Sequence, residues 1–168
     1  MLSVQLLRRY QRKGVLIDTN LLIGYIVGTL SPTHLVHCRA TKAFSIDDFV
    51  LLRDFLAKFQ CIVTTPHVLT EVSNLAGRLP ESLHIPFRRV FQTIIGSLSE
   101  ESESSKTISM KEDFLRFGLT DTAISLIAPD RYLVLTDELP LSGLLHKRGV
   151  HVLNFNHLRS LSWVPEWQ

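Results

Sequence analysis

Short apolar runs alternate along the chain with longer segments in which apolar residues recur at helical spacing. The short runs have the length and the β-branched or aliphatic composition of buried strands. They are VLID at 15–18, CIVTT at 61–65, YLVLT at 132–136 and VHVLNF at 150–155. A further brief strand is predicted at Thr107 to Ser109. Helical spacing predicts helices over 2–12, 46–59, 82–98 and 138–148.

Residues with strong preferences for helix starts support one of these helices and predict a further one. Ser45, with Asp48 three residues later, forms a capping-box pattern ahead of the segment 46–59. Thr65 followed by Pro66 predicts an N-cap and the first position of another helix, which carries Glu71.

The alternation of strands and helices predicts the fold class. Parallel strands need crossover connections, and these place helices over both faces of the sheet. We therefore expect an α/β fold of three layers, α/β/α, with a central, mostly parallel five-stranded sheet in a single domain over 1–168. Its N-terminal helix lies within 1–13, and the Ser- and Glu-rich segment 99–106 is predicted to be a flexible surface loop.

Composition narrows the class of protein. A chain of 168 residues can bury about 70% of the surface that it exposes when unfolded, so it needs no disulfides to fold. Cys38 and Cys61 form no CxxC pair, and together with the absence of a secretory signal pattern this favours a cytoplasmic protein. The most apolar stretch, 21–30, has about half the length of a membrane-spanning helix, so we expect no membrane span.

The charge of the chain gives little indication of whether it binds nucleic acid. A net charge of +2 is too small to indicate nucleic-acid binding by itself. The clusters RRYQRK at 8–13, Arg88 with Arg89, and HKR at 146–148 could each contact phosphate, although such clusters are more often solvated helix faces.

Acidic residues occur where the predicted fold directs side chains toward one edge of the sheet. Asp18 follows the first strand, and Asp137 and Glu138 follow the strand at 132–136. Glu71 lies on the helix after Pro66, and Asp121 follows Thr120. Taken singly, each has an ordinary structural explanation: an Asx turn, a solvated helix face or a favourable interaction with a helix dipole.

Taken together, these acids predict a metal site. Thr120 is expected to cap a helix that Pro129 ends near Ala128, which would bring Asp121 to the same sheet edge. Carboxylates that gather in one cleft repel one another, and Mg²⁺ or Mn²⁺ relieves the repulsion by accepting hard oxygen ligands. Such an ion activates water and neutralises charge on phosphate, which is the chemistry of phosphodiester hydrolysis.

The order and spacing of the acids resemble those of the PIN-domain family. Its members open with a strand that ends in Asp-Thr-Asn or a similar sequence, as VLIDTN does at 15–20. A Glu follows on the helix after the second strand, here within TTPHVLTEVSNLA at 64–76, and an Asp opens a later helix, here LTDTAISLIA at 119–128. A further strand ends in Thr and an acid, here LVLTDELPL at 133–141, so the resemblance covers nearly the whole chain.

The resemblance implies an endoribonuclease that uses Mg²⁺ or Mn²⁺ to cut single-stranded or looped RNA. Three acids would bind the metal, and a fourth would hold a metal or orient water. These are Asp18, Glu71 and Asp121, with either Asp137 or Glu138 as the fourth. The family spacing selects Glu138, whereas Asp137 directly follows Thr136, so both stay open; Asn20 and Thr136 would give polar support.

The resemblance also implies partners. Many small family members are toxins of toxin–antitoxin pairs of the VapBC type, which adds an antitoxin-like protein and a homodimer to the expectations. A second hypothesis is a PIN-like binding or scaffolding module with weak or no catalysis. A phospho-accepting receiver domain fits less well, because the chain lacks a convincing acceptor Asp on a central strand and a Lys after the last strand.

Overall fold

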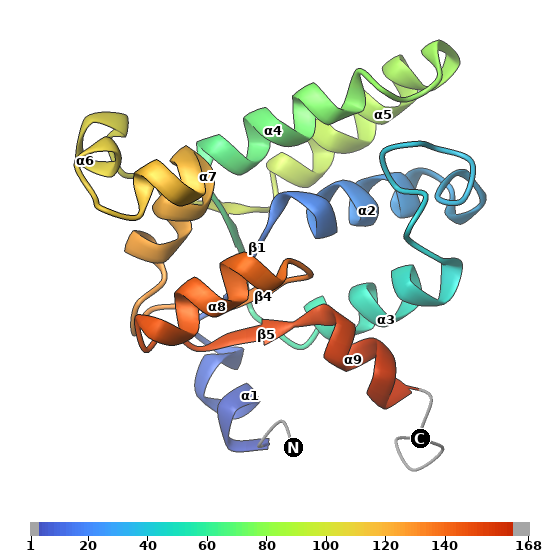
Figure 1. Ribbon diagram of the computed structural model, residues 1–168. Helices are drawn as coiled ribbons and strands as arrows, with labels where there is room; N and C mark the ends of the chain where they lie inside the picture. Colours follow the sequence, from blue (N-terminus) through green and yellow to red (C-terminus); the bar gives the residue numbers. More distant parts are fainter. Residues whose placement is uncertain (1–3, 163–168) are drawn as a thin grey trace.

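The structure, a computed structural model, describes residues 4–162. Within them, five strands form one parallel sheet in the spatial order β3-β2-β1-β4-β5 (Figure 1). The strands are β1 (Val15–Ile17), β2 (Ile62–Thr64), β3 (Ser99–Glu100), β4 (Leu133–Thr136) and β5 (Val152–Asn154). The predicted three-layer α/β/α class is confirmed, with a sheet that is parallel throughout.

Helices connect and flank these strands. They are α1 (Val4–Gln11), α2 (Thr19–Leu30), α3 (Ile46–Leu56), α4 (Pro66–Ala76), α5 (Glu81–Ile95), α6 (Ser105–Ser109), α7 (Phe114–Ile127), α8 (Leu139–Lys147) and α9 (Phe155–Ser162), with a 3-10 turn at Pro32–His34. No helix of the described chain has both the length and the apolar character that crossing a membrane requires.

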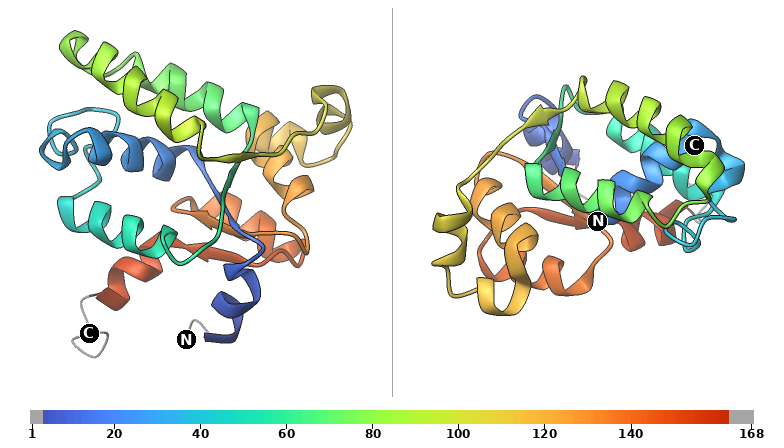
Figure 2. Two further views of the ribbon diagram at one scale, coloured as in Figure 1. Left: turned by 180° about the vertical axis from the view of Figure 1, so that it is seen from behind. Right: turned by 90° about the horizontal axis from the view of Figure 1, so that it is seen from above.

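Two groups of helices cover the two faces of the sheet (Figures 1 and 2). The chain moves from β1 to β2 to β3 in one direction across the sheet and from β4 to β5 in the other. Because crossover connections between parallel strands are right-handed, the connections in opposite directions lie on opposite faces. Helices α2 to α5 therefore pack together on one face, and α7 and α8 pack together on the other.

The strand order reverses between β1 and β4. Val15, Leu16 and Ile17 pair with Leu133, Val134 and Leu135, so the residues that follow these two strands emerge side by side. In open parallel sheets this carboxyl-edge crevice is where ligands bind.

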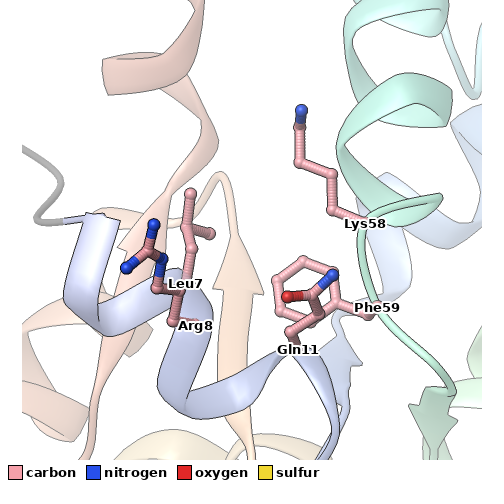
Figure 3. Close-up of a pocket in the computed structure, with 5 residues that line it drawn as sticks. All are labelled: Leu7, Arg8, Gln11, Lys58 and Phe59. Carbon is pink, nitrogen blue, oxygen red and sulfur yellow. The ribbon is translucent and has the colours of Figure 1, made fainter.

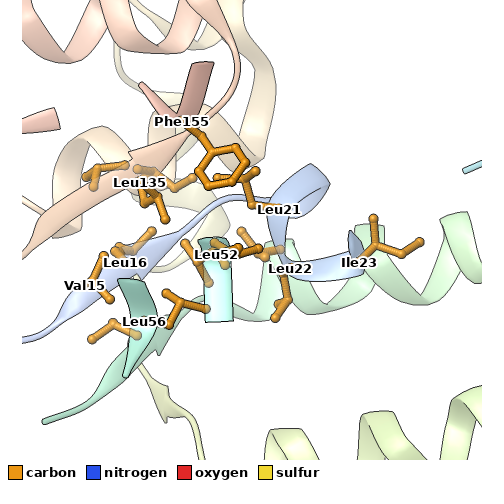
Figure 4. Packing of buried hydrophobic residues seen from close by; sticks show 14 of the residues in the cluster. Val15, Leu16, Leu21, Leu22, Ile23, Leu52, Leu56, Leu135 and Phe155 are labelled. Atoms are coloured by element: carbon orange, nitrogen blue, oxygen red, sulfur yellow. The ribbon is translucent and has the colours of Figure 1, made fainter. Parts of the chain in front are cut away.

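The hydrophobic core is built around β1, whose side chains are fully buried. Leu22 of α2 and Leu52 and Leu56 of α3 pack close to it (Figure 4). Complete burial of a Leu or Ile side chain contributes about 1.5–3 kcal/mol, so the core holds the central strand firmly in place.

Most predicted elements are confirmed to within a few residues. The capping box at Ser45 forms, with its hydroxyl accepting from the Asp48 amide at 3.0 Å. Thr65 caps α4 with Pro66 at its first position. The described part of the N-terminal helix runs over Val4–Gln11; residues 2 and 3 lie outside the described residues.

The predictions of a loop over 99–106 and a strand at 107–109 are wrong except at residues 101–104, which form a loop. Ser99 and Glu100 form the edge strand β3, paired with Val63 and Thr64, where a loop was expected. A polar edge strand of two residues carries no apolar signal, because its outer side faces solvent. The expected strand at Thr107 to Ser109 is part of helix α6, since the Ser104 hydroxyl accepts from the Thr107 amide and caps this helix.

Two glycines provide a matched test of core packing. A Cβ on Gly28 of α2 would overlap the Phe49 ring, whereas a Cβ on Gly143 of α8 would meet nothing within 4 Å. We expect Gly28→Ala to lower the free energy of unfolding by about 1–3 kcal/mol through overpacking, and Gly143→Ala to raise it by about 0.5–1 kcal/mol through helix propensity. Urea denaturation followed by circular dichroism measures both, and equal effects at the two positions would contradict the packing described.

Candidate functional site

Asp18 lies at the carboxyl end of β1 and begins α2. Its backbone is extended, and its Oδ1 accepts from the Leu21 amide at 3.1 Å, which makes it the N-cap of that helix. Its Oδ2 accepts from the Asp137 amide at 3.3 Å. The side chain is only 4% exposed, so this carboxylate links the ends of β1 and β4 from a buried position.

The turn after β4 brings two more acids to Asp18. The Thr136 hydroxyl accepts from the Glu138 amide at 3.0 Å. Asn20 donates from Nδ2 to Glu138 Oε1 at 3.0 Å and, more weakly, to Asp137 Oδ1 at 3.4 Å. Asn20 and Thr136 thus have contacts consistent with the supporting positions expected for them.

Glu71 reaches the same edge from α4, and two threonine hydroxyls hold it. Thr19 of α2 donates to Oε2 at 2.7 Å, and Thr120 of α7 donates to Oε1 at 2.6 Å. The expectation that Thr120 caps a helix is wrong. Helix α7 begins at Phe114 and is kinked at Gly118, whose φ is 71°; Thr120 lies within the helix after the kink, and its hydroxyl bonds Glu71.

Burial and mutual repulsion raise the pKa values of Asp18, Asp121 and Glu138. Burial, and then the neighbouring Asp137, raise the pKa of Asp18 to about 8. Burial, and then Glu138 and Glu71, raise the pKa of Asp121 to about 7. The pKa of Glu138 is also raised, by burial and then by Asp137 and Glu71. Each of the five predicted acids therefore lies within electrostatic reach of at least two others.

The donor set suits a hard divalent cation, but the side chains do not surround one. All five acids offer carboxylate oxygens, and no ion pair within residues 4–162 joins any of them to Lys or Arg. Even so, no three His, Cys, Asp or Glu side chains in that part of the chain converge in a metal-ligand arrangement. Glu71 and Glu138 are instead held by neutral donors, as expected for carboxylates that repel one another.

Sequence reasoning missed several polar residues at this edge. Thr19 and Thr120 hold Glu71, and Asn156 donates from Nδ2 to the Asp137 carbonyl at 2.9 Å. Each of the two threonines directly adjoins a predicted acid in the sequence, but this position alone does not predict that its hydroxyl bonds Glu71. No sequence signal existed for Asn156, because its role depends on helix α9, which was not predicted.

The basic clusters lie away from the acids. The cluster 8–13 precedes β1, and the cluster 146–148 precedes β5, so both are at the amino edge of the sheet, opposite the acids. Arg148 forms an ion pair with Asp113. Arg88 and Arg89 are exposed on α5.

Comparison of the chain with models of known protein families found no match, and comparison with curated proteins found none either.

The pKa of Asp18 leads to a prediction for pH dependence. An unfolded Asp has a pKa of about 3.9, so between that value and about 8 the native state binds more protons than the unfolded state. The free energy of unfolding of metal-free protein should fall as pH rises through this range. Asp18→Asn retains a good helix cap and removes the charge. We expect its Tm in EDTA to fall less between pH 5 and pH 8, by at least about 2 °C, which corresponds to about 1 kcal/mol.

Asp47→Asn is the matched control, because Asp47 is an exposed acid in the first turn of α3. It should keep the wild-type dependence of Tm on pH. An Asp18→Asn profile that overlays the wild-type profile would show that Asp18 ionises as an ordinary surface acid.

Proposed function

We propose that this chain is a Mg²⁺- or Mn²⁺-dependent endoribonuclease of the PIN type that hydrolyses phosphodiester bonds of single-stranded or looped RNA. The observation that carries the proposal is the position of Asp18. It is buried at the point where the strand order reverses, within electrostatic reach of the Asp137 and Glu138 carboxylates and without a basic partner in the described residues. A purely structural role gives no reason to concentrate so much like charge in one place, whereas a cation site does.

The interactions among the acids suggest their roles. Glu138 is electrostatically coupled to Asp18, Asp121 and Glu71, whereas Asp137 acts on Asp18 and Glu138. Glu138 therefore fits the fourth position better than Asp137, as the family spacing also suggests. Asp18, Glu71, Asp121 and Glu138 would hold the ion, and the hydroxyls of Thr19 and Thr120 would keep Glu71 in position.

The bound cation would supply charge neutralisation at the scissile phosphate. Asn20 donates from Nδ2 to Glu138 Oε1 and would fix that carboxylate in position to hold the ion or to orient an attacking water. The unstacked backbone of single-stranded RNA can bring its phosphate to this sheet edge in a way that a regular duplex cannot.

The family resemblance adds two partners to the proposal. An antitoxin-like protein would restrain the activity in the cytoplasm by covering the acids. A homodimer would bury exposed apolar side chains on α5, such as Ile85 and Ile95, which are 56% and 39% exposed.

A binding or scaffolding module is the second candidate, and one observation favours it. The carboxylates of the described residues do not converge on a common point. If these carboxylates stay apart when divalent metal is added, the chain would be a binding module without metal-dependent nuclease activity. Binding of Mn²⁺ separates the two candidates.

Removing the Asp18 charge tests the proposed activity directly. Purified protein incubated with a pool of cellular RNAs should cut them in Mn²⁺ and leave them intact in EDTA, with cut ends mapped by sequencing. We expect Asp18→Asn to lower the cleavage rate by at least about 100-fold, the scale of losing one electrostatic contact to a transition state. The Asp47→Asn control should cut at the wild-type rate. Cleavage that persists unchanged in EDTA would rule out the proposed chemistry.

Thr120 offers a test of the hydroxyl contacts around Glu71. Groups that orient a metal ligand typically contribute 10- to 100-fold in metal affinity or activity, and we expect Thr120→Val to weaken Mn²⁺ binding by about that factor. Thr120→Ser retains the hydroxyl and should bind Mn²⁺ nearly as the wild type does. Isothermal titration calorimetry measures both affinities. Equal Mn²⁺ affinity in the Val and Ser variants would show that the Thr120 hydroxyl does not position Glu71 for metal binding.

A further inference from the structure

A recess lies at the amino edge of the sheet, opposite the acids. Leu7, Arg8 and Gln11 of α1 form one wall, and Lys58 and Phe59, which follow α3, form the other (Figure 3). The Gln60 amide donates to the Gln11 carbonyl at 2.8 Å and ties the two walls together. Because these residues precede β1 and β2, which run parallel, they are separated from Asp18 by the length of the sheet.

The two cations of this recess are available to a ligand. Within residues 4–162, the side chains of Arg8 and Lys58 form no hydrogen bond or ion pair. Nearby basic residues differ: Arg9 pairs with Asp130 at 3.6 Å, and Lys13 donates to the Asp130 carbonyl at 2.7 Å. A favourable effect on helix dipoles accounts for basic residues near helix ends in general. The dipole effect does not explain why a hollow lies between Arg8 and Lys58.

The lining combines three kinds of chemistry. Leu7 and Phe59 give apolar surface, the Gln11 amide can donate and accept, and the Arg8 and Lys58 charges flank the opening. The hollow measures about 250 Å³, below the roughly 300 Å³ at which pockets for drug-sized ligands begin. It therefore suits one small flat group that carries negative charge on either side. An unstacked nucleotide in a single strand, with its base inside and its phosphates outside, has this chemistry.

We propose that this recess is an exosite that holds one nucleotide of single-stranded RNA while the acids act on a distant phosphate. Its assignment to RNA rests on the proposed function. A strand that occupies both edges must pass around the sheet, so the exosite would favour substrates of several nucleotides over very short ones.

The salt dependence of RNA binding tests this exosite. The measurement uses the Asp18→Asn variant in EDTA, so that the RNA is not cut. Fluorescence anisotropy gives the Kd of this variant for a labelled single strand of roughly 16 nucleotides, the upper site size of single-strand binding folds. Each phosphate contact contributes about 0.7 to the slope of log Kd against log salt concentration. Adding Arg8→Gln and Lys58→Gln should therefore reduce the slope by about 1.4.

A second charge-matched pair and a crosslink complete the experiment. Arg39→Gln with Lys42→Gln removes the same charge from an exposed segment elsewhere and should leave the slope unchanged. RNA that contains 4-thiouridine should crosslink to the peptides that carry Gln11 or Phe59. An equal loss of slope in the two double variants, or crosslinks found only elsewhere, would overturn the exosite. If the exosite passes this test but wild-type protein with Mn²⁺ cuts no RNA, only the nuclease proposal fails.

Discussion

The parallel pairing of β1 with β4 is the constraint on which the site depends. Val15–Ile17 and Leu133–Leu135 are in register, so Asp18 and the turn at Asp137 must emerge together at the point where the strand order reverses. Helices α4 and α7 then meet above this edge, where Glu71 bonds Thr120. The sheet and the helices thereby bring four segments that are distant in the sequence to one edge of the sheet.

This arrangement costs stability, and the core offsets it. A buried carboxylate beside other carboxylates is unfavourable, as the raised pKa of Asp18 reflects. The fully buried side chains of β1 and the helices packed on them hold the backbone in place despite the repulsion. Strongly perturbed carboxylate pKa values of this kind cluster at functional sites.

The sequence was sufficient for the fold class because strands such as VLID and YLVLT are apolar on both faces, as buried parallel strands must be. It was insufficient for β3, because Ser99 and Glu100 become a strand only through pairing with Val63 and Thr64. The acids could be predicted from their places at strand ends and helix starts. The hydroxyl contacts of Thr19 and Thr120 could not, because they depend on the packing of α2 and α7 against α4.

The central claim is that the acids at the β1 and β4 ends share one divalent ion. Anomalous X-ray scattering from crystals grown with Mn²⁺ tests it most directly. We expect a manganese peak within bonding distance of carboxylate oxygens from Asp18 and Glu138, with Asp121 drawn toward them. Crystals saturated with Mn²⁺ that show no peak among these side chains would contradict it.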